Sequence, residues 1–430
     1  LKYKITEVIM DKIISVIEGA DPNVVLACGT FLLASLIYVI MTFAMGNTKK
    51  EPEKLYPFML GLATGNPKYK VTQQDALKVA LKVPNLQGMR SVLERLYSNT
   101  RIGTRYMAVP DFTPDQRQEE DELFYEEDGT DFSVPIQHRL DRFKLEAVPL
   151  VTDVCKRAIA DAGVTPADIH KLVVVSSTGF LGPSLDCELI VNLGLPRSTD
   201  RTLVGFMGCA AAMNGYRVAM DYTMAHPGKL ALMVCVEISS VHTTFKESIN
   251  DSVIHAIFGD GCAACVIAAK PKSEIPRGTL CIVEEHGWLM EGTEDGITLA
   301  INDDGISCTL SKHLPQYISK NMGGFVDALL KKQSMTREQV DFWAIHPGGK
   351  RIIEEAQNGL GVTDAQAADS WYVLQQYGNM LSPSVMFVLE RIFKRNREAV
   401  ARGEEGYKMG LAFSFSPGVG AEGIMLRQIH

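Results

Sequence analysis

A long uncharged stretch lies near the beginning of the chain. Residues 24–46 read VVLACGTFLLASLIYVIMTFAMG, with no charged residue and no proline. Because about 20 apolar residues span the hydrocarbon core of a bilayer, the stretch predicts a membrane-crossing helix. Asp21 is its expected N-cap and Pro22 its first residue. We expect a membrane anchor; a cleaved or bipartite targeting segment and a helix covered by the protein or a dimer partner stay open as alternatives.

The segment before this stretch has helical periodicity. One face of a helix over residues 5–17 would carry six apolar side chains: Ile5, Val8, Ile9, Ile13, Val16 and Ile17. Such an amphipathic helix suits a membrane surface or a partner protein. Two lysines, residues 49–50, follow the uncharged stretch, whereas Glu18 and Asp21 precede it. The positive-inside rule therefore places the rest of the chain in the cytosol, with an organelle as the alternative location.

Helical and strand-like segments alternate from about residue 145 onward. Residues 146–162 have the period of a helix, and short apolar runs predict four buried strands, at 171–177, 230–236, 342–346 and 409–415. Continuous apolar strands between helices indicate an α/β fold whose sheets are covered on both faces. Residues 47–70, rich in Lys, Pro and Gly, are interpreted as a linker that enters this body. The decapeptides 258–267 and 416–425 resemble each other weakly, each a glycine-rich turn that leads into an apolar strand.

Composition excludes some functions. The chain has 430 residues, 46% of them hydrophobic, and its net charge of −8 argues against non-specific nucleic-acid binding. The nine cysteines are odd in number and lie mostly in apolar runs, which indicates reduced, buried thiols. Cys262 and Cys265 have the CxxC spacing of a metal site, but no second pair accompanies them. We expect them to be core residues and expect no metal.

Cys209, His346 and Asn379 are the candidate catalytic residues. Cys209 follows Gly205-Phe206-Met207-Gly208 and precedes three alanines, where a strand gives way to a helix start that would favour a thiolate. His346 ends an apolar strand and is followed by Pro347-Gly348-Gly349. Asn379 lies in the turn Tyr377-Gly378-Asn379-Met380. A thiol, an imidazole and a carboxamide can act as nucleophile, activator and oxyanion donor, although each alone could be an ordinary structural residue.

These motifs together resemble the type III polyketide synthases, the chalcone-synthase-like branch of the thiolase superfamily. The resemblance extends over roughly residues 55–430, and its motifs are residues 205–212, 235–238, 257–261, 342–349, 377–380 and 414–422. It implies a thiolase-like αβαβα layered α/β fold built from two duplicated halves. We accordingly expect N-terminal helices in residues 1–50, a half with the nucleophile in residues 51–275, and a half with His346 and Asn379 in residues 276–430.

The resemblance also implies the substrates and the residues around them. The enzyme would be a homodimer that works directly on malonyl-CoA and an acyl-CoA starter, without a further cofactor. Phe258 would be a gatekeeper between a CoA tunnel and the cavity, although it could be an ordinary core aromatic. Other cavity residues depart from the plant pattern: His242 replaces Thr, Cys308 replaces a second gatekeeper Phe, Leu381 replaces Ser, and Phe415 lies in Ser-Phe-Ser-Pro-Gly. Arg95 matches a CoA-binding basic residue, and Arg90 and Arg101 are possible substitutes for the others.

The sequence therefore predicts an acyltransferase that loads an acyl starter on Cys209 and extends it by decarboxylative condensation with malonyl-CoA. The polyketide would cyclise to a phloroglucinol, resorcinol or pyrone. Replacement of an aromatic gatekeeper by Cys308 favours an acetyl, malonyl or fatty acyl starter over a bulky phenylpropanoid. Two alternatives stay open. One is a ketoacyl-carrier-protein synthase, which condenses once, and the other is an inactive membrane-tethered scaffold.

Overall fold

The structure is a computed structural model that describes residues 12, 14–16, 18–44, 53–113, 118, 123–125 and 134–429. Its contacts separate residues 1–54 from residues 55–430, and the second unit contains all of the strands that are described. The two units are therefore treated separately. The predicted amphipathic helix over residues 5–17 falls mostly outside the described ranges.

Helix α2 (Pro22–Ala44) confirms the predicted hydrophobic helix. The Asp21 carboxylate accepts a hydrogen bond of 2.8 Å from the Asn23 amide, so the helix begins with the expected N-cap and proline. No residue of the window Pro22–Val39 is buried, and its mean hydropathy is 1.8. By length and composition alone the helix could cross a bilayer, and a targeting segment near the N-terminus would meet the same criteria.

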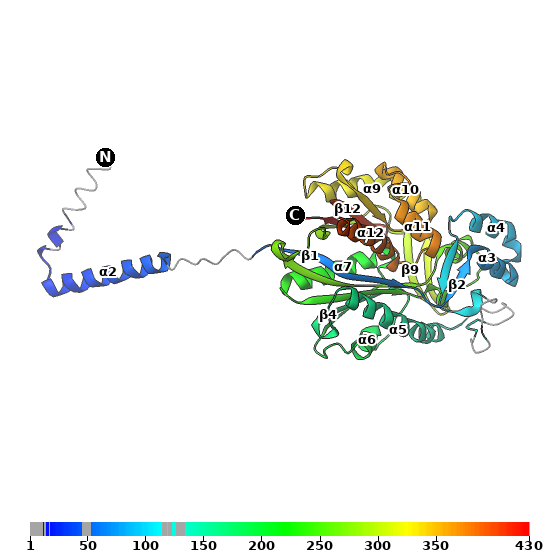
Figure 1. Ribbon diagram of the computed structural model, residues 1–430, viewed down its shortest axis with the longest axis horizontal. Helices are drawn as coiled ribbons and strands as arrows, with labels where there is room; N and C mark the ends of the chain where they lie inside the picture. Colours follow the sequence, from blue (N-terminus) through cyan, green and yellow to red (C-terminus); the bar gives the residue numbers. More distant parts are fainter. Residues whose placement is uncertain are drawn as a thin grey trace. The chain divides into compact units, whose positions relative to one another are not determined.

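A nine-stranded mixed sheet organises residues 55–430, in the order β11-β12-β13-β8-β1-β7-β6-β4-β5 (Figure 1). Its strands are β1 (Leu55–Gly65), β4 (Ile169–Ser176), β5 (Asp200–Gly205), β6 (Leu230–Glu237), β7 (Gly261–Pro271), β8 (Cys281–Leu289), β11 (Phe342–Ile345), β12 (Met409–Ser416) and β13 (Gly420–Arg427). The four predicted strands are confirmed as β4, β6, β11 and β12. Two ribbons stand apart: β2 (Tyr69–Thr72) with β3 (Thr104–Met107), and β9 (Ile297–Asn302) with β10 (Gly305–Leu310).

The interpretation of residues 47–70 as a linker is wrong, because residues 55–65 form strand β1 between β7 and β8. Its content of Lys, Pro and Gly is typical of a linker. A Cβ atom at Gly61 would lie 2.4 Å from the Ala158 carbonyl oxygen and 2.4 Å from the Ala162 amide nitrogen. Gly61 is therefore a site where helix α5 (Ile136–Asp161) approaches the backbone of β1 closely, a use of glycine that local composition does not distinguish from a linker.

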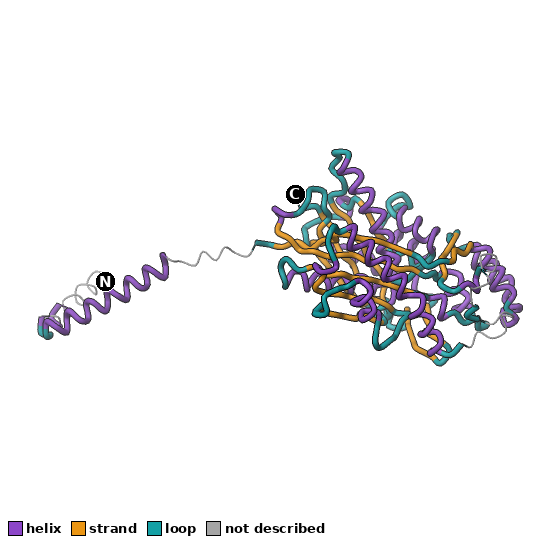
Figure 2. The backbone as a smooth tube through the Cα atoms, turned by 60° about the horizontal axis from the view of Figure 1, so that its bottom comes forward, coloured by secondary structure: helices purple, strands orange, loops and turns teal. Residues whose placement is uncertain are grey.

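The two halves of the sheet share a layer of inner helices, and further helices cover the outer face of each half (Figures 1 and 2). Helices α7 (Ala211–Ala225) and α12 (Pro383–Ala401) pack on each other and on strands from both ends of the sheet. On the opposite faces, α5 and α6 (Leu185–Leu193) cover β1, β7, β6 and β4, while α9 (Leu314–Lys331) covers β8 and β13. The remaining helices are α3 (Gln73–Lys82), α4 (Arg90–Ser98), α8 (Ile249–Ile257), α10 (Lys350–Leu360) and α11 (Ala368–Tyr377). The thiolase-like layered α/β fold is thereby confirmed.

The two ends of the sheet repeat one pattern of strand directions. Strands β4-β6-β7-β1 pair parallel, antiparallel and antiparallel, and β11-β12-β13-β8 pair in the same sequence of directions. The weakly similar segments 258–267 and 416–425 lead into β7 and β13, which occupy equivalent places. The predicted boundary at 275/276 stays a prediction, because residues 55–430 form one compact unit.

Cys262 and Cys265 both lie on β7 and are completely buried. Side chains three positions apart on a strand point to opposite faces. Accordingly, Cys262 packs in the core under α5, and Cys265 packs in the core around α7. The two thiols cannot ligate one ion, so their expected role as core residues is confirmed.

The close approach at Gly61 makes a prediction about stability. Gly61→Ala is expected to lower the free energy of unfolding by about 2–3 kcal/mol, the upper range for overpacking, because the new methyl group would meet backbone atoms of α5. Gly205→Ala is the matched control in the same sheet, where the nearest atom to an added Cβ is 3.7 Å away. Denaturant unfolding measures both. Equal stability of the two variants would contradict the assigned packing of β1 on α5.

Candidate active site

Three turns bring the predicted catalytic residues into one chamber. Cys209 follows β5 and precedes α7, His346 follows β11, and Asn379 lies between α11 and α12. All three line a cavity of about 50 Å³. The inner helices α7 and α12 both begin beside this cavity, because α7 follows the turn of Cys209 and α12 follows the turn of Asn379. The site is therefore assembled from both halves of the fold.

The turn that carries Cys209 has a constrained backbone. Phe206 and Gly208 have φ angles of +57° and +58°, in the left-handed region that is unusual for phenylalanine. The Gly208 amide donates a 3.0 Å hydrogen bond to the Ser177 hydroxyl, and the Ser414 hydroxyl donates one of 2.8 Å to the Cys209 carbonyl. The turn is thus held from both halves, and the thiol faces the chamber at the entrance to α7.

The Cys209 thiol is close to the amide of Asn379. Its Sγ lies 4.0 Å from both Oδ1 and Nδ2 of Asn379. The thiol is accessible from the cavity but surrounded by protein, and this burial raises its pKa well above that of a free cysteine. The nearby Cys308 thiol and Glu237 carboxylate raise the pKa further, whereas the contact with Asn379 lowers it.

His346 is a buried base without a partner. Its side chain is 1% exposed, and neither ring nitrogen has a hydrogen-bond partner among the described residues. The backbone is fixed by a 3.0 Å bond from the His346 amide to the Phe413 carbonyl. A Cβ atom at Gly348 would lie 3.2 Å from Nε2, so this glycine leaves room beside the ring. Buried polar atoms are normally paired, so the two unpaired nitrogens make His346 a candidate to accept or donate a proton in the chamber.

Asn379 is held on both sides. Its backbone amide donates a hydrogen bond of 2.8 Å to the Ile257 carbonyl, and its backbone carbonyl accepts one of 3.0 Å from the Gly259 amide. In the side chain, Oδ1 accepts from the Leu381 amide at 2.8 Å and Nδ2 donates to the Gly348 carbonyl at 3.1 Å. These bonds fix the orientation of the carboxamide. One N–H of Nδ2 remains as a donor on the side of Cys209.

Burial also sets the charge of this site. It lowers the pKa of His346 to about 3, while it raises the pKa of Cys209. Each group alone is therefore neutral near pH 7. Transfer of the thiol proton to the imidazole would create a thiolate and an imidazolium without changing the net charge of the chamber. Such a pair can generate a nucleophile without taking a proton from solvent.

The structure places most of the predicted cavity residues at this chamber. Phe258, Cys308, Leu381 and Phe415 line it together with the three catalytic candidates. A second cavity of about 330 Å³ adjoins it, and Phe258, Leu299, Cys308 and Leu381 line both. These shared residues therefore form a wall between a small reaction chamber and a larger compartment.

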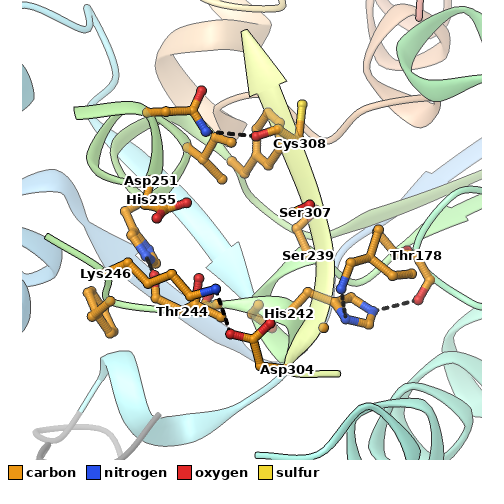
Figure 3. Close-up of a pocket in the computed structure, with 18 of the residues that line it drawn as sticks. Thr178, Ser239, His242, Thr244, Lys246, Asp251, His255, Asp304, Ser307 and Cys308 are labelled. Carbon is orange, nitrogen blue, oxygen red and sulfur yellow. Dashed lines mark hydrogen bonds and ion pairs between the residues drawn. The ribbon is translucent and has the colours of Figure 1, made fainter. Parts of the chain in front are cut away.

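His242 lines the larger cavity but its ring nitrogens are already engaged, as Figure 3 shows. Nε2 lies 2.7 Å from the Thr178 carbonyl, and Nδ1 accepts from the Ile306 amide at 3.3 Å. Nε2 must therefore carry the proton. Burial lowers the pKa of His242 to about 4, which keeps it neutral. Only the ring carbons of His242 can contact a ligand.

The predicted CoA-binding arginines lie elsewhere. Arg95 is exposed on α4 and is not among the residues that line either cavity. Arg90 lies 3.4 Å from Glu94 in an exposed ion pair. Arg101 lies 4.2 Å from the Trp371 ring and 3.6 Å from the Asp364 carboxylate. Their roles toward CoA stay predictions.

Glu237, within the motif 235–238, is a buried residue for which the sequence predicts no role. It is completely buried at the end of β6 and accepts hydrogen bonds from the Ser382 hydroxyl (2.6 Å) and the Thr178 hydroxyl (2.7 Å). The Ser177 amide also donates to it at 3.0 Å. Burial raises the pKa of Glu237 to about 7. The sequence signal for Glu237 is a single carboxylate in an apolar strand, because a buried carboxylate needs several hydrogen-bond donors around it.

Comparison with known protein families identifies both halves of the chain. Residues 47–271 match the family model described as "Chalcone and stilbene synthases, N-terminal domain". Residues 283–430 match "Chalcone and stilbene synthases, C-terminal domain". The two models together extend over most of the chain and leave the helix α2 outside.

Individual relatives give the same result. "Alpha-pyrone synthesis polyketide synthase-like Pks18" of Mycobacterium tuberculosis is 42% identical over 366 residues, which are 85% of this chain and 89% of the relative. The crystal structure of PKS-I from the brown alga Ectocarpus siliculosus is 65% identical, with a TM-score of 0.87 over 88% of this chain and 100% of that one. The type III domain of Steely1 from Dictyostelium is 25% identical, with a TM-score of 0.76 over 87% of this chain and 100% of that one.

Proposed function

Because the chain belongs to the chalcone and stilbene synthase family and is a malonyl-CoA-dependent type III polyketide synthase, we propose that Cys209, His346 and Asn379 carry its chemistry. The observation that supports this most is the chamber itself. It holds an accessible thiol, a buried imidazole with two unpaired nitrogens, and an oriented amide donor. A site with these three groups suits acyl transfer to and from a thioester.

The first step loads the starter. The thiol of Cys209 passes its proton to His346, and the resulting thiolate attacks the thioester carbonyl of an acyl-CoA. The new sulfur–carbon bond forms as the carbon–sulfur bond to CoA breaks, and the CoA thiolate takes the proton back from His346. Donors on His346 and Asn379 stabilise the oxyanion of the tetrahedral intermediate.

The second step extends the chain. Malonyl-CoA loses CO₂, and the electron pair of the broken carbon–carbon bond moves into an enolate. Asn379, which does not titrate, and His346, in its N–H form, donate hydrogen bonds to the enolate oxygen. The enolate carbon then attacks the acyl-Cys209 thioester and releases the Cys209 thiolate. Atoms and charge balance in these reaction steps without a metal or a further cofactor.

The starter and product follow from the cavities and the relatives. Cys308, smaller than the phenylalanine of plant enzymes, lies in the wall between the chamber and the 330 Å³ compartment. A thiol in place of a ring leaves room for an acyl chain to pass. We therefore propose an acetyl, malonyl or fatty acyl starter and cyclisation to a phloroglucinol, resorcinol or pyrone. The name of the Mycobacterium relative, which refers to α-pyrone synthesis, favours a pyrone.

A homodimer is proposed from the edge of the sheet. Strand β5 forms one edge of the sheet and pairs with β4. Apolar side chains near this edge are exposed in the single chain: Phe180 by 58%, Val191 by 57% and Leu203 by 45%. An exposed sheet edge with apolar neighbours is typical of a surface that another chain covers. A second copy of the chain is the proposed partner.

Membrane association is proposed from helix α2. The helix is uncharged, 23 residues long, and has no buried residue in its apolar window. The lysines that follow it favour the cytosolic side for the synthase unit. Targeting to an organelle is the alternative location. In either case the acyl-CoA substrates would have to be available on the side of the synthase unit.

The proposed roles predict that loading and decarboxylation can be separated. Cys209→Ala is expected to abolish acylation and lower polyketide formation by about 1,000-fold or more, while malonyl-CoA is still decarboxylated. Asn379→Ala is expected to slow decarboxylation by roughly 100–1,000-fold, the effect of losing one oxyanion donor. Intact-protein mass spectrometry measures the acyl-enzyme, and ¹⁴CO₂ release from labelled malonyl-CoA measures decarboxylation.

Cys187→Ala is the matched control, because Cys187 is a partly accessible cysteine on α6. It should leave both activities unchanged. A Cys209→Ala variant that still forms polyketide would contradict the assignment of the nucleophile. A folded wild-type protein that neither becomes acylated nor releases CO₂ would favour the inactive scaffold, and dependence on a carrier protein would favour the single-condensation synthase.

The proposed anchor predicts that the full chain floats with phosphatidylcholine vesicles in a density gradient, whereas a chain that begins at residue 51 stays at the bottom. The physical reason is the apolar surface of α2, which insertion into a bilayer would remove from water. The truncated chain keeps the compact unit 55–430 and should retain activity on malonyl-CoA. Recovery of the full chain in the soluble fraction, or its shortening by cleavage near residue 46, would contradict a retained anchor.

A further inference from the structure

The β9–β10 hairpin forms part of the wall between the two cavities. It is a two-stranded ribbon that does not join the nine-stranded sheet. Leu299 on β9 and Cys308 on β10 line both the reaction chamber and the larger compartment. The position of this hairpin therefore affects the shape of the larger compartment. The contacts that fix the hairpin thus help to determine the volume available to the growing acyl chain.

Two attachments along the hairpin are partly buried hydrogen bonds. His242 bonds to the Ile306 amide, as described above. The Asn250 side chain donates to the Cys308 carbonyl at 2.8 Å and accepts from the Leu310 amide at 3.0 Å. Figure 3 shows the contacts at the His242 ring and at the Cys308 carbonyl. Because Asn250 replaces a neighbouring strand for two residues of β10, this side of the hairpin is fixed.

At the turn of the hairpin, an ion pair adds to a backbone hydrogen bond of 2.9 Å from the Ile136 amide to the Asp303 carbonyl. The Asp304 carboxylate lies 2.6 Å from the Lys246 Nζ, and the two side chains are 30% and 56% exposed. Both residues line the larger compartment (Figure 3). Lys246 belongs to the segment between His242 and α8, so the ion pair joins two separate walls at the solvent-facing rim. The hydrogen bond from Lys246 also holds the pKa of Asp304 below its usual range, which favours the charged carboxylate.

We propose that the Lys246–Asp304 ion pair is a specificity-determining latch that closes the solvent-facing end of the larger compartment. The latch limits the length of the acyl or polyketide chain that the compartment accepts. This inference rests on the proposed function of the same site. An exposed ion pair suits such a role, because it stabilises only weakly and can open without unfolding its surroundings. The contacts of His242 and Asn250 and the bond between Ile136 and Asp303 keep the backbone of the wall in place, while the side chains of Lys246 and Asp304 separate at the rim.

Charge reversal tests the latch directly. Lys246→Asp and Asp304→Lys each place like charges at the rim and should open it, whereas the double variant restores an attractive pair. We expect each single variant to raise the ratio of kcat/KM for palmitoyl-CoA to that for acetyl-CoA by about fivefold, near the upper limit for an exposed pair. The double variant should return to the wild-type ratio. For the wild type, 1 M NaCl should shift the ratio toward that of the single variants, because the Debye length falls to about 3 Å.

A second readout does not require turnover. Association of a dansyl-labelled fatty acid with the protein should be faster by a similar factor in both single variants and normal in the double variant. If the wild type is inactive with every starter, the proposed function fails, and this binding measurement still decides whether the latch exists. Glu405→Lys is the matched control, since it reverses one charge of another exposed pair, Lys408–Glu405 at 2.8 Å. Its chain-length ratio and its binding rate should equal those of the wild type.

The proposal would be overturned by either of two results. One is a chain-length ratio and a probe binding rate that do not change in the single variants. The other is a double variant that behaves like the single variants, because the effect would then come from the individual residues and not from their attraction.

Discussion

The packing of α7 against α12 between the two halves of the sheet is the constraint on which the site depends. Each helix is reached through a turn that carries a functional side chain, Cys209 before α7 and Asn379 before α12. Because the helices pack side by side, the thiol and the amide come within 4.0 Å. His346 enters the same chamber from β11, a strand of the half that contains α12. No local segment could build this site, since its parts belong to opposite halves of a duplicated fold.

Burial gives the chamber its chemical character. Charged forms of Cys209 and His346 are both penalised there, as the opposite directions of their pKa shifts show. A proton that moves between them leaves the net charge unchanged. The chamber can therefore contain the Cys209 thiolate and the His346 imidazolium together, but neither charge alone. Glu237 adds a buried carboxylate nearby, and its donors join the segment after β4 to the start of α12. The same residues that position the site therefore also connect the halves.

The sequence predicted those features that have a local signature. The uncharged stretch became α2, four apolar runs became strands, and the turns around Cys209, His346 and Asn379 met as expected. Features that depend on distant partners were missed. Residues 55–65 resembled a linker, because their value as a strand depends on pairing with β7 and on the approach of α5 at Gly61. The ion pair of Lys246 and Asp304 could not be predicted either, because nothing in a single sequence shows that their two segments face one cavity.

The central claim is that a base from one half activates a nucleophile from the other. The rate at which iodoacetamide alkylates Cys209, followed by mass spectrometry of the peptide that contains it, tests this claim most directly. At pH 6 to 8, the wild type should react about 100-fold faster or more than His346→Gln, because the variant cannot accept the thiol proton. Equal rates in the two proteins would show that Cys209 gains nothing from His346, and the account of the site would be wrong.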